Sequence, residues 1–234
     1  MRLDPEVTPA MIAHETERLL DTAAAFANDA ILAPSLCEGW SRGHVLTHVA
    51  RNADGMARVC RAILDDTGET MYAGDDVRDE EIAAGCRRRA ADLAADVRES
   101  AAALAPLLAR LGPDHVGASA ERTPGGRRVA AEDVLFLRLR ELVFHHVDLH
   151  AGFTFAHVAP ELQKLLLDHE VERVSGSAKP PSVTIHTREG EVYTIGEGTA
   201  HVSGSRAGVL AWLGRQQGEG VEAQGELPEI PTGA

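Results

Sequence analysis

Apolar residues near the start of the chain recur at the spacing of a helix. Thr8 and Pro9 form a typical helix start, a capping hydroxyl before a first-turn proline, and the apolar pattern predicts a helix to about Ala27. The segment 29–40 has no sustained period and contains a proline and a glycine, so we expect a loop there. A second helix is predicted after Ser41. Its apolar side is formed by Val45, Val49, Met56, Val59 and Ile63.

Two more helices and a turn are predicted in the next part of the chain. An alanine-rich run predicts a third helix over about 79–111, which Gly112 and Pro113 end. The segment 121–129 contains Pro-Gly-Gly, which indicates a turn in a short hairpin. The fourth helix, about 130–150, is apolar almost all round. This pattern is typical of a central helix, so charged groups within it need partners.

The pattern changes after Gly152, where short alternating runs appear. The predicted elements are a helix at about 159–174, strands at 182–187, 191–195 and 200–204, a helix at 206–215, and an extended tail. The sequence therefore predicts a mixed α and α/β fold. A four-helix bundle would span residues 1–153, and a small C-terminal α+β domain would span residues 154–234.

Composition narrows the class of protein. The 234 residues suffice for one large domain or two modest ones. With 36 acidic and 23 basic residues the formal net charge is −13, which argues against nucleic acid or an anionic membrane as partner. Three cysteines without a CxxC motif fit a reducing compartment. Without a signal-peptide core or an apolar run of about 18 residues, we expect a soluble cytoplasmic protein; its oligomeric state is not fixed by the sequence.

Two of the predicted helices carry histidines on faces that should be buried. Glu141 and His145 lie four residues apart and therefore project side by side from a helix. His48, beside the apolar stripe of the earlier helix, could supply a third ligand. A carboxylate and two imidazoles suit zinc or a similar divalent ion, and three protein ligands leave one coordination position open for catalysis. Asp148 lies near the Glu141 face and could orient a ligand imidazole.

Spacing alone leaves other interpretations open. His146 and His150 are also four residues apart but point to another side of the helix, and a helix that is apolar all round does not discriminate between the two pairs. Glu141 could also form a structural ion pair with Arg138 or Arg140, because a buried carboxylate needs a counter-charge. A single histidine beside an apolar stripe is more often a hydrogen-bonded core residue than a ligand.

Four stretches of the chain resemble one known family. They are 38-EGWSRGHVLTHVARNADG-55, 71-MYAGDDVRDEEIAAG-85, 139-LRELVFHHVDL-149 and 201-HVSGSRAGVLAWLGR-215. Together they resemble the mycothiol-dependent maleylpyruvate isomerase family, which belongs to the DinB-like metalloenzyme superfamily. The resemblance covers nearly the whole chain in order. It implies a DinB-like, metal-binding four-helix bundle followed by a small sterol-carrier-like α+β domain.

The resemblance also implies roles for particular residues. The implied metal ligands are His48, Glu141 and His145. Arg78 and Arg215 match arginines that would hold the substrate carboxylates or the thiol cofactor. His146 departs from the family pattern, which has a small residue beside the ligand; it could crowd the site or face another helix. His146 and His150 thus become secondary candidates.

The implied reaction agrees with this set of side chains. Maleylpyruvate is a dianionic cis-enone, and its conversion to fumarylpyruvate requires rotation about a double bond. A thiolate that adds to the olefin leaves a single bond free to rotate, and the thiolate then departs. A divalent ion promotes loss of the thiol proton, and bidentate arginines suit the two carboxylates. The thiol is expected to be mycothiol and not a cysteine of the chain; Cys37 is nearest in sequence to the site.

Three functions follow as hypotheses. The leading one is a metal- and mycothiol-dependent maleylpyruvate isomerase in gentisate-type breakdown of aromatic compounds. The alternative enzyme is a mycothiol S-transferase acting on another electrophile, in detoxification or natural-product biosynthesis. Such a transferase would not need two arginine clamps for carboxylates. The third is a non-catalytic protein that binds a hydrophobic ligand in the C-terminal domain, which the few apolar residues there disfavour. The sequence fixes neither the metal nor the physiological substrate.

Overall fold

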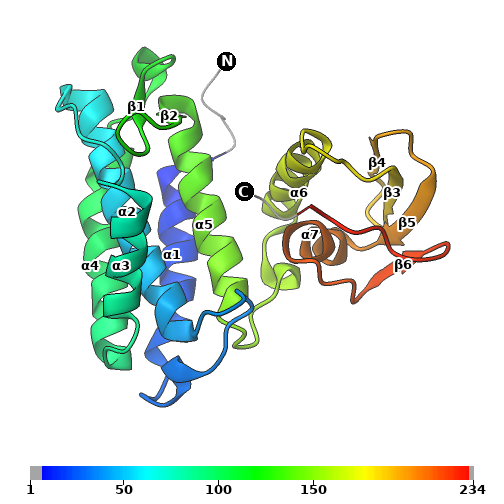
Figure 1. The fold of residues 1–234 in the computed structure, drawn as a ribbon, viewed down its shortest axis with the longest axis horizontal. Helices are drawn as coiled ribbons and strands as arrows, with labels where there is room; N and C mark the ends of the chain where they lie inside the picture. The colour runs from blue at the N-terminus through cyan, green and yellow to red at the C-terminus, as the bar shows by residue number, and fades with distance from the viewer. Residues whose placement is uncertain (1–6, 232–234) are drawn as a thin grey trace. The chain divides into compact units, whose positions relative to one another are not determined.

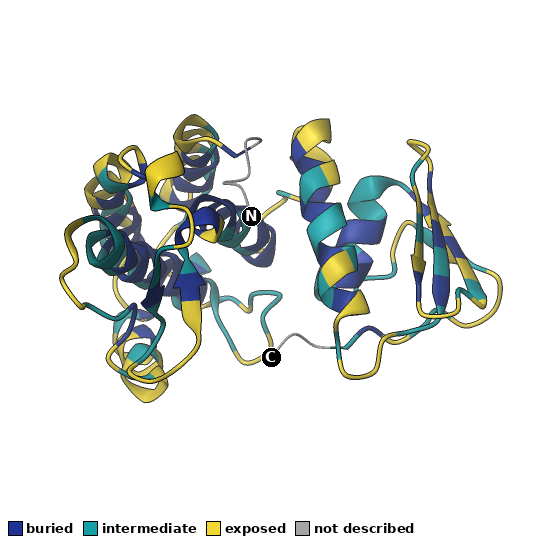
Figure 2. Ribbon diagram, turned by 90° about the horizontal axis from the view of Figure 1, so that it is seen from above, coloured by how far each residue is buried: buried dark blue, intermediate teal, exposed yellow. Residues whose placement is uncertain are grey.

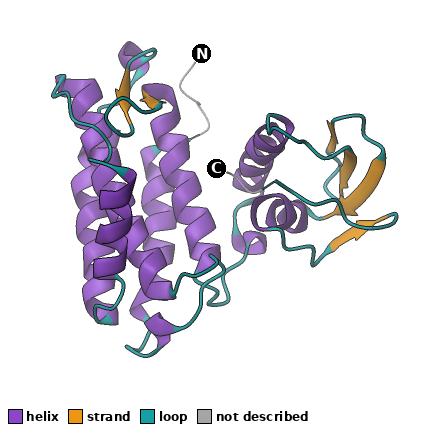
Figure 3. Ribbon diagram, viewed as in Figure 1, coloured by secondary structure: helices purple, strands orange, loops and turns teal. Residues whose placement is uncertain are grey.

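The structure is a computed structural model that describes residues 7–231. The chain divides into two compact units, with the division between Gly152 and Phe153. The first unit is helical and the second combines helices with a sheet (Figures 1 and 3). The assignment of independent domains to residues 1–153 and 154–234 stays a prediction, which separate expression of the two segments would test.

Four long helices form the bundle of the first unit. They are α1 (Pro9–Ala24), α2 (Arg42–Asp65), α4 (Ala90–Leu108) and α5 (Val134–Asp148). Helix α1 packs against α4 and α5, and α2 packs against the same two helices (Figure 1). The four helices therefore enclose one core. Leu19, Val49, Leu93 and Leu142, one from each helix, are fully buried in it. This packing supplies most of the stabilisation, because each apolar helix face is removed from water.

The helix starts follow from local chemistry. The Thr8 hydroxyl accepts a hydrogen bond from the backbone N–H of Met11 (3.3 Å), and Pro9 begins α1, as the sequence predicts. At the start of α2, the backbone N–H of Ser41 donates to His44 Nδ1 (3.2 Å), which occupies one of the groups that a helix end leaves without a partner. These starts fix where each helical face begins.

The single third helix predicted over 79–111 is wrong. The structure has two helices instead, α3 (Asp75–Gly85) and α4, joined by residues 86–89. A β-carbon at Gly43 would collide with the Cys86 carbonyl oxygen, and one at Gly85 would lie 2.5 Å from Thr47 Cγ2. The end of α3 therefore packs closely against α2, at positions where only glycine leaves enough space. Periodicity does not report such contacts.

Two short strands and a shorter last helix complete the first unit. Strands β1 (Ser119–Glu121) and β2 (Arg128–Ala130) pair antiparallel, which confirms the predicted hairpin. Helix α5 ends at Asp148, two residues before the predicted end, because the chain turns there. His150 has a φ of +49° and Gly152 a φ of +91°, both in the left-handed region that stops a helix.

The second unit places two helices on one face of a four-stranded sheet. The helices are α6 (Pro160–Ser175) and α7 (Arg206–Arg215), and the strand order is β4 (Val192–Ile195), β3 (Val183–Thr187), β5 (Ala200–Gly204), β6 (Val221–Ala223). Strands β3 and β5 run parallel, and the other neighbours are antiparallel. Leu167, Val174 and Trp212 from the helices are buried against Ile185 and Val202 of the sheet. Strand β6 follows the last predicted helix in a segment for which no strand was predicted.

Burial alternates along the strands of this sheet (Figure 2). In β3, Val183 and Ile185 are buried whereas His186 is exposed, which is the pattern of a sheet with one covered face.

Within residues 7–231, every helix is too short or too polar to cross a membrane.

Candidate metal centre

The three side chains implied as metal ligands meet where α2 packs against α5. His48 Nε2 lies 2.8 Å from Glu141 Oε2, and His145 Nε2 lies 3.3 Å from the same oxygen. The donor atoms of all three side chains lie within 4.8 Å of one another. The two imidazole rings meet edge to face, with centroids 4.5 Å apart. The structure thus assembles a carboxylate and two imidazoles from segments about ninety residues apart in sequence.

Helix geometry explains how the sequence produces this cluster. Glu141 and His145 lie one turn apart on α5, and both side chains remain partly accessible, with exposed fractions of 23% and 14%. His48 lies beneath them on α2 with 5% of its surface exposed. The cluster is therefore shielded by the bundle and open on one side, as a site for a small ligand requires.

Asp148 fixes the orientation of His145. This carboxylate is fully buried and accepts a hydrogen bond from His145 Nδ1 (2.8 Å), so that Nε2 faces Glu141. It also accepts one from Cys37 Sγ (3.3 Å), while its backbone carbonyl accepts the N–H of Leu36 (2.9 Å). The loop before α2 is thereby tied to the end of α5. A carboxylate behind an imidazole is the usual arrangement at protein metal sites.

Proximity shifts the pKa values of the three groups. Burial would raise the pKa of Glu141, but hydrogen bonds from His145 and His48 hold it well below its ordinary value. Burial would likewise lower the pKa of His145, yet hydrogen bonds, led by the one to Asp148, raise it well above its ordinary value. Burial and the nearby His145 lower the pKa of His48. An ionised carboxylate therefore lies between one protonated and one neutral imidazole.

This donor set fits a divalent ion. Two imidazole nitrogens and a carboxylate oxygen are ligands that zinc and related ions accept, and three protein ligands leave room for an exogenous one. The Nδ1 atom of His145 is already held by Asp148, so its Nε2 atom is the one directed to the cluster. A cation among these atoms would be attracted by the charge of the Glu141 carboxylate, which now accepts hydrogen bonds from the imidazoles. A second group, Cys37, His145 and Asp148, overlaps the first and shares one histidine with it.

The rival histidines point elsewhere. His146 is buried and its Nε2 lies 2.7 Å from the Thr22 hydroxyl of α1, so it faces another helix and does not crowd the cluster. His150 is exposed and lies beyond the end of α5. Arg138 hydrogen-bonds to α2 instead of pairing with Glu141, and Arg140 stacks over the Phe144 ring at 4.5 Å.

Arg78 lies beside the cluster. This arginine on α3 places Nη2 3.3 Å from His48 Nδ1, while Nη1 donates to Asp79 (2.7 Å). Its guanidinium lies 5.8 Å from the centre of the Tyr72 ring. Burial and the charge of Glu141 raise the pKa of Tyr72, so its hydroxyl remains protonated at neutral pH.

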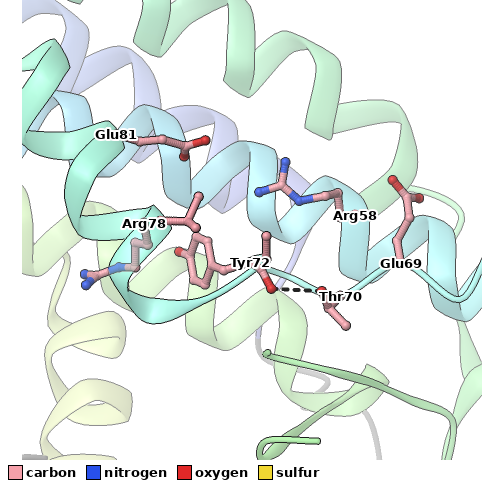
Figure 4. Close-up of a pocket in the computed structure, with 8 residues that line it drawn as sticks. Arg58, Glu69, Thr70, Tyr72, Arg78 and Glu81 are labelled. Atoms are coloured by element: carbon pink, nitrogen blue, oxygen red, sulfur yellow. Dashed lines mark hydrogen bonds between the residues drawn. The ribbon is translucent and has the colours of Figure 1, made fainter. Parts of the chain in front are cut away.

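A cavity of about 280 Å³ opens next to this arginine. Figure 4 shows Arg58, Glu69, Thr70, Tyr72, Arg78 and Glu81 around it. Sequence reasoning missed Arg58 and Tyr72. Tyr72 lies in the 71–85 stretch that carries the resemblance, a signal that could have identified it. Arg58 has no such signal, because it is one of many arginines on polar helix faces.

Arg215 is the last residue of α7 in the second unit. Its Nη1 donates to the carbonyl oxygen of Gly214 (2.7 Å). Its predicted role in holding substrate or cofactor stays a prediction.

Comparisons with known proteins identify the family of the chain. Residues 12–150 match the family model of the mycothiol maleylpyruvate isomerase N-terminal domain. A crystal structure of the mycothiol-dependent maleylpyruvate isomerase matches 95% of this chain and 94% of its own, with a TM-score of 0.84 and 27% identity. A crystal structure of a histidine-to-alanine mutant of that isomerase matches equally well, with a TM-score of 0.84 and 26% identity.

No curated protein sequence matches the chain. The predicted fold class, a DinB-like four-helix bundle with a small C-terminal α+β domain, is confirmed by the structural match. The chain belongs to the mycothiol-dependent maleylpyruvate isomerase family.

Proposed function

We propose that the protein is a metal- and mycothiol-dependent isomerase that converts maleylpyruvate to fumarylpyruvate. The observation that carries this proposal is the convergence of His48, Glu141 and His145 on one open cluster. In the proposal these three residues hold the ion, and zinc is the ion that this donor set favours first. The proposed setting is gentisate-type breakdown of aromatic compounds in the cytoplasm.

The metal and the thiol supply the chemistry that the side chains lack. When bound, the ion lowers the pKa of the thiol, and reversible addition of the thiolate turns the double bond into a single bond that can rotate. The residues of the chain bind and orient. Asp148 holds the His145 ring so that Nε2 faces Glu141, and Trp40 lies 5.5 Å from the His48 ring and shields it.

The neighbouring cavity gives the substrate a place to bind. Arg58 and Arg78 line it, and a guanidinium can hold a carboxylate through two parallel hydrogen bonds. Arg78 is the one next to the cluster, so we propose that it positions a substrate carboxylate beside the reacting olefin. Glu69 also lines the cavity, but Arg61 neutralises it through hydrogen bonds of 2.9 and 2.8 Å. Arg215 is proposed as a second carboxylate or thiol ligand.

A mycothiol S-transferase is the second candidate. Glu81 lines the same cavity as the two arginines, and its carboxylate suits a neutral electrophile better than it suits a dianion. The two activities share the cluster and differ in whether the thioether is released or reversed.

One assay separates the two candidates. Turnover of maleylpyruvate is followed by absorbance with and without mycothiol, before and after chelation, and again after zinc is restored. Activity that needs both the thiol and the metal supports the isomerase. A metal-loaded protein that leaves maleylpyruvate unchanged, but consumes mycothiol with another electrophile, identifies the transferase. Full activity after complete removal of metal would exclude both.

A further inference from the structure

Arg138 on α5 is a charged side chain buried in the bundle core with part of its hydrogen-bonding capacity unused. Its exposed fraction is 0%. Nη1 donates to the Val49 carbonyl (3.0 Å) and to Asn52 Oδ1 (2.8 Å), both on α2. Nε and Nη2 have no hydrogen-bond partner in the part of the chain that the structure describes. These two N–H groups lie on the same edge of the guanidinium, the edge that receives a carboxylate side-on.

The nearest acidic groups are committed elsewhere. Glu141 binds two imidazoles, and Asp54 pairs with Arg51 (3.1 Å). Burial lowers the pKa of Arg138 to about 10, with Glu141 opposing that shift, so the guanidinium remains charged at neutral pH. A buried cation without a matched anion is costly, and a carboxylate that reached the unpaired Nε and Nη2 atoms would remove that cost.

A cavity lies beside Arg138. It has a volume of about 170 Å³ and lies between α1 and α4, with Arg138 among its lining residues. The cavity walls are apolar and include Ile12, Leu20, Ala101, Leu104, Ala105 and Leu108. Arg98 and Glu17 lie at the exposed rim and carry opposite charges. The cavity shares no lining residue with the metal cluster or with the cavity of Arg58 and Arg78.

We propose that this cavity is a binding site for a small organic monoanion, a carboxylate on a compact apolar body such as a benzoate. The carboxylate would pair with Nε and Nη2 of Arg138, and the hydrocarbon would lie among the apolar side chains of α1 and α4 that line the cavity. Figure 1 shows where these two helices lie in the bundle. The size agrees, since a dry apolar cavity of about 150 Å³ is known to take up one benzene molecule. Charge selects an anion, and apolar walls select against a sugar phosphate or an inorganic anion.

Titration of the purified full-length protein with benzoate tests the site. Calorimetry should give saturable binding of one benzoate per chain, and thermal unfolding should shift upward with benzoate concentration. Benzamide, the neutral analogue of the same shape, should bind about tenfold more weakly or worse, because charge-assisted hydrogen bonds are about twice as strong as neutral ones. Equal affinity for benzamide, or no saturable binding up to about 10 mM benzoate, overturns the proposal.

A pair of variants localises the binding without disturbing Arg138. Ala105→Phe places a ring in the cavity from an exposed position on α4, and Ala103→Phe adds the same ring at an exposed position outside it. Benzoate binding should be lost in the first variant and kept in the second. Metal content and maleylpyruvate turnover should be unchanged in both, so the result does not depend on the proposed isomerase activity. Benzoate binding that survives Ala105→Phe would place the ligand elsewhere and reject this site.

Discussion

At the scale of the residue, Asp148 connects the cluster to the surrounding chain. Its fully buried carboxylate accepts hydrogen bonds from an imidazole and a thiol, and its backbone carbonyl oxygen accepts one from a loop N–H. The position of His145 Nε2 therefore depends on a side chain that does not itself reach the cluster. Asp148 acts by positioning, and its contribution should be measurable apart from that of the three proposed ligands.

Asp148→Asn keeps the size of the side chain and removes its charge. We expect metal affinity to fall about 10- to 100-fold, as is usual when the partner of a ligand imidazole is changed. Competition with a chromophoric chelator measures the affinity. Because the amide fills the same volume, the midpoint of urea unfolding of the metal-free protein should change much less. An unchanged metal affinity would remove Asp148 from the support of the cluster.

His48→Ala should abolish bound metal and turnover, because only two of the three proposed donors remain. The bundle should stay folded, because the substitution removes a single side chain from one helix. Metal analysis, turnover and circular dichroism measure the three properties. His14→Ala, an exposed histidine on α1, is the matched control and should behave as the unmodified protein. Full activity in a metal-depleted His48→Ala protein would contradict the proposed mechanism.

The candidate site could be predicted only in part from its residues. Spacing identifies two pairs on one helix, Glu141 with His145 and His146 with His150, but it does not choose between them. The resemblance implies the first pair, and the structure brings that pair together with His48, whereas α5 ends before His150. Metal binding by the first pair stays a prediction. The two N–H groups of Arg138 that lack a partner could not be foreseen, since this depends on which side chains of the neighbouring helices pack around the guanidinium.

At the scale of the element, the contact of α2 with the end of α3 shows what periodicity omits. The alanine-rich run reads as one continuous helix, yet the backbone closes on Gly43 and Thr47 and the helix stops at Gly85. Long amphipathic helices were predicted well because burial of one face dominates their stability. Strand β6 is only three residues long and is defined by pairing with β5, which local pattern does not encode.

Gly43→Ala tests that contact. The added β-carbon meets a backbone oxygen, which cannot move away as a side-chain tip can, so we expect a loss of about 1–3 kcal/mol in the free energy of unfolding. Urea denaturation monitored by circular dichroism measures it. Gly112→Ala, where a β-carbon meets nothing within 4 Å, is the control. Equal stability of the two variants would show that α3 does not pack this closely on α2.

An ion pair in the second unit should make its stability depend on acid pH. Hydrogen bonds from Arg206 hold the pKa of Glu191, which precedes β4, at about 2, against an ordinary value of 4.5. A carboxylate with a lowered pKa stabilises the fold above the unfolded-state value, and that contribution is lost as pH falls from about 4.5 towards 2.

In Glu191→Gln the free energy of unfolding should therefore fall less across this pH range than in the unmodified protein. The difference should be on the order of 1–3 kcal/mol, as for a charge-assisted pair. Thermal unfolding at a series of pH values measures the slope. Glu222→Gln, which removes an exposed partner of Arg188, should leave the slope unchanged. A slope that is the same in all three proteins would show that Glu191 is not the acid-sensitive group.

At the scale of the whole molecule, the two units carry different parts of the family evidence. The family model covers residues 12–150, whereas the match to the solved isomerase covers 95% of the chain and so includes the second unit. The proposed metal ligands all lie in the first unit. A contribution of the second unit to catalysis therefore rests on Arg215, and one substitution there tests it.

Arg215→Ala should lower kcat/KM for maleylpyruvate by about tenfold or more, which corresponds to about 1.4 kcal/mol, without changing the metal content. Steady-state kinetics and metal analysis measure both. Arg188→Ala, an exposed arginine in the same unit, is the control. Unchanged kinetics in the Arg215 variant would confine the reaction to residues of the bundle.

The hydrogen bond between Cys37 and Asp148 has a practical consequence for handling the protein. The thiol proton of Cys37 is donated to the carboxylate that orients His145, so a cysteine that has been alkylated or oxidised to a disulfide or a sulfinate no longer donates there. Protein purified in air would then hold metal less tightly than protein kept under reductant, although its helices would be intact. Two preparations of the protein would then differ severalfold in activity, and the oxidation state of the Cys37 sulfur would account for the difference.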